Sequence, residues 1–259
     1  ITVNLAPADR KKEGSAFDLP ISIGILAASG QISETNFDDY IILGELSLDG
    51  NLASMKGVLP VAIQAKKDGF KKIILPIDNA NEAAIVDGID VYGAHNLKEV
   101  IDIIYGKSEI TPTKINTRAL FFENLKSSEF DFSDVKGQES VKRAMEIAAA
   151  GGHNIILVGP PGSGKTMLAK RIASILPPMS LHEALETTKI HSVLGKVKKM
   201  GLIAERPFRS PHHTCSAVAL VGGGGYPQPG ELSLAHNGVL FLDELPEFKR
   251  EVLEVMRQP

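Results

Sequence analysis

Residues 159–166 read Gly-Pro-Pro-Gly-Ser-Gly-Lys-Thr and fit the pattern G-x-x-x-x-G-K-T of a phosphate-binding loop. The loop follows an apolar run, Ile155–Val158, and precedes a segment with helical periodicity, which is the context that gives this pattern its meaning. Its glycines let backbone N–H groups approach phosphates without Cβ clashes, Lys165 would reach the β and γ phosphates, and the Thr166 hydroxyl would bind magnesium. A chance glycine turn would not explain why strand, loop and helix patterns agree. We expect ATP and Mg²⁺ as ligands, with nucleotide contacts from Gly159, Pro160, Pro161, Gly162, Ser163, Gly164, Lys165 and Thr166.

A second apolar run, Val239–Leu242, ends on two carboxylates, Asp243 and Glu244. In a doubly wound sheet, the C-terminal ends of parallel strands line one ligand crevice. We therefore expect Asp243 to bind Mg²⁺ together with Thr166, and Glu244 to polarise the attacking water. The alternative is that both carboxylates only cap the next helix. The phosphate-binding loop favours catalysis, with Glu244 and Lys165 as catalytic residues.

The patterns around these residues predict an α/β fold in two domains. Residues 1–106 alternate between strand and helix patterns and form the first domain, residues 107–130 form a connector without sustained period, and residues 131–259 form the second domain. Expected strands are Ile1–Leu5, Ile41–Leu43, Ile73–Leu75, Ile89–Tyr92, Ile155–Val158 and Val239–Leu242. Expected helices are Leu19–Ser29, Val58–Lys67, Asn79–Val86, one capped by Asn96, Glu139–Ala150 and one after the phosphate-binding loop.

Composition sets broad limits on the protein class. The chain has 259 residues, 43% of them hydrophobic and 23% charged, with a net charge of −3, which is typical of a globular α/β protein. Its single cysteine rules out an internal disulfide framework and fits a reducing cytoplasm. No run approaches the roughly 20 apolar residues that span a bilayer, so we expect no membrane partner. Both ends look cut, and we expect the second domain to be truncated C-terminally.

Several motifs resemble known families. Asp134–Gln138, the phosphate-binding loop and residues 239–244 together resemble the AAA+ ATPases, and this resemblance places Gln138 near the adenine. Arg206–Thr214 and Gly230–His236 resemble the magnesium-chelatase-like ComM (YifB) family, over essentially the whole chain. The resemblance implies a hexameric ATP-hydrolysing motor, a DNA helicase or branch-migration factor that acts on single-stranded or branched DNA in natural transformation and recombination. The alternative is a magnesium-chelatase-type motor subunit that remodels a protein partner.

The first domain resembles the Lon-protease-like domain at the N-terminus of ComM proteins, through Lys12–Asp18 and the run that ends at Pro76. Lon enzymes use a serine nucleophile and a lysine base. The resemblance places the serine position at Ala16 and the lysine position at Leu59, and both side chains are chemically inert. We therefore expect a catalytically inactive domain, not a protease. It is interpreted instead as a platform for assembly or DNA docking.

A basic, glycine-rich stretch from Lys196 to Ala235 predicts a mobile insertion. In magnesium-chelatase relatives, an insertion at this place faces a central pore, which implies DNA phosphate contacts. A solvated basic face is an equally good interpretation. The candidate contacts are Lys196, Lys198, Lys199, Arg206 and Arg209, and a weaker zinc hypothesis involves His212, His213 and Cys215.

Overall fold

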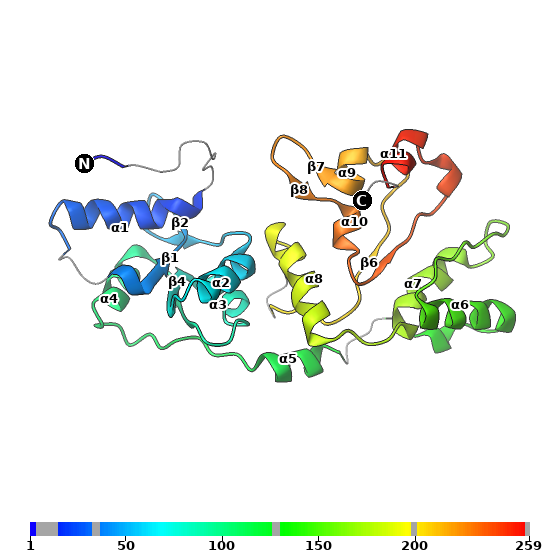
Figure 1. The fold of residues 1–259 in the computed structure, drawn as a ribbon, viewed down its shortest axis with the longest axis horizontal. Helices are drawn as coiled ribbons and strands as arrows, with labels where there is room; N and C mark the ends of the chain where they lie inside the picture. Colours follow the sequence, from blue (N-terminus) through cyan, green and yellow to red (C-terminus); the bar gives the residue numbers. More distant parts are fainter. Residues whose placement is uncertain (4–14, 33–36, 126–129, 198–200, 257–259) are drawn as a thin grey trace. The chain divides into compact units, whose positions relative to one another are not determined.

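The computed structural model describes residues 1–3, 15–32, 37–125, 130–197 and 201–256 (Figure 1). The chain divides into two compact units. Unit 1 contains Ile1–Thr117 and Gly195–Leu202, and unit 2 contains Arg118–Leu194 and Ile203–Pro259. Both units are mixed α/β and contain parallel strand pairs, which confirms the predicted fold class.

A three-stranded parallel sheet forms the centre of unit 1. Its strands, in spatial order, are β1 (Tyr40–Ile42), β4 (Lys72–Pro76) and β5 (Asp90–Ala94). The side chains of β4 alternate between two cores: Ile73 and Leu75 are buried on one face of the sheet, and Ile74 is buried on the other. Because both faces of the central strand are covered, its sequence is a continuous apolar run.

Two pairs of helices cover the two faces of this sheet. On the face of Ile73 lie α2 (Val58–Lys67) and α3 (Ile77–Ala83), and on the other face lie α1 (Asp18–Ala28) and α4 (Leu97–Ile104). The predicted cap of α4 is confirmed, since the Asn96 side chain accepts a hydrogen bond from the Glu99 N–H. The smaller elements are η1 (Ser15–Phe17), η2 (Phe37–Asp39), β2 (Glu45–Leu46) and β3 (Leu52–Ala53).

Two expectations for this half of the chain differ from the structure. Ile1–Val3 is not in a strand, and the rest of the predicted N-terminal strand lies outside the described residues. The segment expected to be a featureless connector begins by packing on unit 1, where the Thr113 N–H donates to the Val91 carbonyl and the Thr117 hydroxyl donates to the Ile85 carbonyl. It then forms α5 (Thr117–Asn124).

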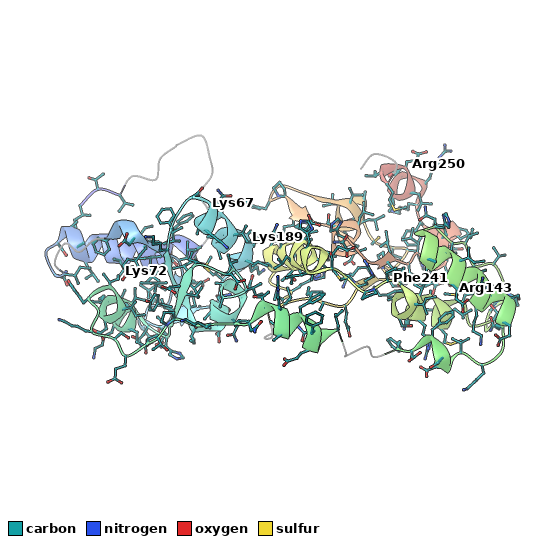
Figure 2. The ribbon with its side chains drawn as sticks, turned by 60° about the horizontal axis from the view of Figure 1, so that its bottom comes forward. Lys67, Lys72, Arg143, Lys189, Phe241 and Arg250 are labelled. Atoms are coloured by element: carbon teal, nitrogen blue, oxygen red, sulfur yellow. The ribbon has the colours of Figure 1, made fainter. Side chains whose placement is uncertain are left out.

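Unit 2 contains the helices that flank the phosphate-binding loop and a short parallel strand pair. The loop lies between α6 (Glu139–Gly151) and α7 (Lys165–Ile175), which pack together around Met145 and Leu168. The strands β6 (Phe208–Arg209) and β9 (Val239–Leu240) are parallel neighbours. Just beyond β9, Phe241 stacks on Phe208 with ring centroids 6.0 Å apart; Figure 2 labels Phe241. The remaining elements are η3 (Phe132–Asp134), α8 (Leu181–Val193), α9 (Ala217–Val221), β7 (Gly222–Gly223), β8 (Gln228–Pro229), α10 (Glu231–Leu234), η4 (Leu245–Glu247) and α11 (Arg250–Val255).

The prediction that Ile155–Val158 forms a fully buried strand is wrong. Leu157 packs against the core formed by α6 and α7, but Ile156 is 78% exposed and Val158 is 89% exposed. No strand within the described residues pairs with this run.

Most of the stretch predicted to be a mobile insertion, from Ile203 to Ala235, folds as part of unit 2, whereas its first residues belong to unit 1. Its helix α9 buries Leu220 completely beside Phe248 and Val252, and α10 buries Leu234. The strands β7 and β8 form a short antiparallel hairpin between these helices. Gly222 has a φ of 103°, and a Cβ there would lie 2.6 Å from the Gln228 carbonyl oxygen, so this turn requires glycine.

Candidate nucleotide site

The phosphate-binding loop ends where α7 begins. Gly162 and Gly164 have φ angles of 80° and 84°, in the left-handed region that glycine adopts at little cost, and Gly164 is the N-cap of α7. The N-terminus of this eleven-residue helix therefore adjoins the loop. Unpaired N–H groups and the positive end of the helix dipole make this position favourable for phosphate.

The Lys165 side chain folds back over the loop. Its Nζ lies 2.8 Å from the carbonyl oxygens of both Gly159 and Pro160, and 3.5 Å from Ser163 Oγ. These are neutral acceptors, whereas phosphate oxygens carry negative charge and form stronger hydrogen bonds with an ammonium group. The loop thus holds the Lys165 ammonium where phosphate oxygens could replace the carbonyl oxygens as its hydrogen-bond partners.

The two predicted magnesium ligands meet across a sequence separation of 77 residues. The Thr166 hydroxyl donates to Asp243 Oδ2 at 2.9 Å. A hydroxyl and a carboxylate are hard oxygen ligands of the kind that Mg²⁺ prefers, in company with phosphates and water. This donor pair fits Mg²⁺.

Glu244 follows directly, in a left-handed conformation with a φ of 53° that is uncommon for a residue with a side chain. Its N–H donates to Asp243 Oδ1 at 3.1 Å, and its side chain is 66% exposed. Oε2 of Glu244 lies 3.3 Å from Nδ1 of His213. From the sequence, His213 was a candidate only as a zinc ligand. Its place beside Glu244 depends on the pairing of β6 with β9.

Gln138 lies beside the same loop. It is the N-cap of α6, in a left-handed conformation, and its Nε2 donates to the Ser163 carbonyl at 3.4 Å. The structure therefore brings Gln138 together with the phosphate-binding loop. The contact with adenine stays a prediction.

Two of the candidate DNA contacts have other partners. The Arg206 guanidinium donates to the carbonyls of Pro177 and Asn237 and pairs with Glu183, and its side chain is only 15% exposed. Arg209 forms a two-pronged pair with Glu231 at 2.5 and 2.7 Å, and these hydrogen bonds raise the pKa of Arg209. Both arginines have intramolecular partners in unit 2, and their contact with DNA stays a prediction. Lys196 is exposed, and Lys198 and Lys199 lie outside the described residues.

Replacing Arg206 with alanine should destabilise unit 2 by about 2–4 kcal/mol, because it leaves two carbonyls and one carboxylate without their cationic donor. The free energy of unfolding in urea measures this loss. Arg250→Ala is the matched control, since that side chain is 90% exposed and forms only an i,i+4 pair with Glu254, worth roughly 0.5 kcal/mol or less. Equal stability of both variants would contradict a structural role for Arg206.

The zinc hypothesis has no geometric support. Within the described part of the chain, no group of three or more His, Cys, Asp or Glu side chains could hold a metal ion. The His212 and His213 rings contact each other in a tilted arrangement with centroids 4.1 Å apart, and Nδ1 of His212 bonds to the Thr214 hydroxyl. The Nδ1 atoms of both rings therefore have protein partners, Thr214 for His212 and Glu244 for His213.

The positions that the Lon resemblance identifies are structural. Leu59 is fully buried in α2, and its N–H donates to a Glu82 carboxylate oxygen. Ala16 lies in η1, and its carbonyl accepts from the Gly44 N–H. The neighbouring Ser15 hydroxyl bonds to the Glu45 carboxylate. The absence of protease activity stays a prediction that these contacts favour.

Comparisons with known proteins agree with these motifs. Residues 131–259 match the family described as magnesium chelatase, subunit ChlI, and residues 1–79 match the family described as subunit ChlI of Mg-chelatase. The whole chain is 49% identical to YifB of Escherichia coli and 46% identical to the competence protein ComM of Haemophilus influenzae. This chain belongs to the ComM/YifB family. It is thus a magnesium-chelatase-like AAA+ family protein.

The family assignment covers the whole chain, but only part of its relatives. The chain spans 50% of the E. coli protein and 51% of the H. influenzae protein, about half the length of each. A further similarity joins 45% of the chain to 22% of Lon protease 2 of Bacillus subtilis, at 32% identity. Among the helices of the described residues, none has the length and apolar character needed to cross a membrane.

Proposed function

We propose that this chain binds ATP with Mg²⁺ and hydrolyses it as part of an AAA+ motor. The observation that carries the proposal is the hydrogen bond between Thr166 and Asp243, which unites the end of the phosphate-binding loop with the carboxylates after β9. The Lys165 ammonium beside the loop and the N-terminus of α7 supply the positive charge that a triphosphate needs.

Each residue has one role in this proposal. Lys165 binds the β and γ phosphates, while Thr166 and Asp243 hold Mg²⁺, which neutralises charge on the phosphates. Glu244 orients the water that attacks the γ-phosphorus and accepts its proton as the bond to the ADP oxygen breaks. The remaining loop residues and Gln138 position the nucleotide.

We further propose that the motor acts on single-stranded or branched DNA as a homo-hexameric helicase or branch-migration factor. The support is the 46% identity to a protein named for competence. The magnesium-chelatase family matches favour a second candidate, a motor subunit that remodels a protein partner. For unit 1, with Leu59 buried and Ser15 bonded to Glu45, we propose a platform for assembly or DNA docking.

DNA dependence of ATP turnover separates the two candidates. For the full-length protein, we expect single-stranded or forked DNA to raise the ATP hydrolysis rate several-fold, with less stimulation at higher salt because phosphate contacts release counterions. Phosphate release assays with and without DNA measure this effect, and sedimentation in ATP tests hexamer formation. Unchanged turnover with every DNA form would favour the chelatase-type motor.

A further inference from the structure

The histidines after β6 share one end of the sheet with the carboxylates after β9. Because β6 and β9 are parallel neighbours, their C-terminal ends lie side by side, and the segments that follow diverge from one place. Three residues beyond β9 is Asp243, and four residues beyond β6 is His213. The result is the 3.3 Å approach between His213 Nδ1 and Glu244 Oε2.

The imidazole of His213 is the better anchored member of this pair. Its ring contacts the tilted His212 ring, with centroids 4.1 Å apart, and meets Phe248 edge-on at 6.4 Å. Phe248 is itself 4% exposed and packs in the core with Leu220. The His213 side chain is 26% exposed, whereas that of Glu244 is 66% exposed. An exposed glutamate has several accessible rotamers, and an anchored imidazole 3.3 Å from its carboxylate selects among them.

We propose that His213 is a positioning residue for Glu244. Its Nδ1–H restrains the carboxylate that orients the attacking water, so it acts through Glu244 and does not touch the nucleotide. This inference rests on the proposed ATP hydrolysis. Because His213 affects the orientation of one side chain, loss of its imidazole should lower kcat about tenfold and leave the affinity for ATP unchanged.

The first test compares three variants of the full-length protein in ATP hydrolysis. We expect His213→Ala to lower kcat about tenfold at unchanged KM. His213→Asn should recover most of the rate, because its amide N–H can occupy the place of the Nδ1–H. His182→Ala is the control, since that histidine is 81% exposed on α8 and pairs only with Glu186. An unchanged or increased rate in His213→Ala, or a loss confined to KM, would overturn the inference.

The second test is a double-mutant cycle with Glu244→Gln, measured in single-turnover hydrolysis. If His213 acts through Glu244, adding His213→Ala to Glu244→Gln should change the residual rate less than about twofold. A tenfold loss in both backgrounds would show that His213 acts independently of Glu244, and would refute the positioning role. Thermal unfolding of each variant separates a rate effect from a general loss of structure.

Failure of the inference and failure of the proposed function give different results. If the wild-type protein hydrolyses ATP, Lys165→Ala does not, and His213→Ala is as fast as wild type, only the inference fails. If the wild-type protein does not bind or hydrolyse ATP, both the proposed function and the inference fail.

Discussion

Lys165→Ala should lower the affinity for ATP by at least about 100-fold, which corresponds to ~2.7 kcal/mol. The Lys165 ammonium lies 2.8 Å from two carbonyl oxygens of the loop and is placed to exchange them for phosphate oxygens. Removing one partner of a charged, hydrogen-bonded pair lowers the binding free energy by roughly 2–5 kcal/mol or more. Titration calorimetry with ATP and Mg²⁺ measures the change, with the chain itself as the sample.

A matched control lies on the same helix. Lys170 is an exposed lysine of α7 that is five residues from Lys165, so Lys170→Ala removes the same charge from the same element. We expect its ATP affinity to stay within about twofold of wild type, because an exposed charge at that distance from the loop is screened by solvent and salt. If Lys165→Ala bound ATP as tightly as Lys170→Ala, the assignment of the nucleotide site would be wrong.

The parts of this site that were predictable follow local rules. The glycine loop and the helix are consecutive in the chain, so spacing alone located Lys165 and the start of α7. The meeting of Thr166 with Asp243 is not local; it was expected from a strand at Ile155–Val158, yet it occurs although this run pairs with no strand among the described residues. In unit 1, β4 and α2 were predictable because their apolar periods match their secondary structures.

The features that the sequence did not reveal depend on partners that are distant in sequence. The charge of Arg206 suggested phosphate binding, yet its partners are carbonyls and a carboxylate up to 31 residues away. The apolar run Ile155–Val158 predicted a fully buried strand, but burial depends on neighbouring elements and not on the composition of the run alone. His213 became a candidate beside Glu244 only when β6 was found next to β9.

Glu244→Gln should lower the rate of ATP hydrolysis by about 100-fold or more while ATP binding persists, so that the variant traps ATP. A glutamine side chain keeps the size of glutamate and can still hydrogen bond, but it cannot accept a proton from water, and general-base catalysis contributes roughly 10²–10⁴-fold. The neighbouring Thr166–Asp243 contact does not involve the changed side chain, so the magnesium ligands stay in place. Phosphate release by the full-length protein measures the rate.

The control for this variant is Glu247→Gln, because Glu247 is an exposed carboxylate in η4, three residues further along the chain. It removes the same charge without touching Asp243 or His213, and we expect turnover within about twofold of wild type. Equal rates for the two variants would exclude Glu244 as the base. A loss of ATP binding in Glu244→Gln would instead assign Glu244 to the nucleotide or its metal, since a residue that acts only on the attacking water lowers kcat without weakening the bound state.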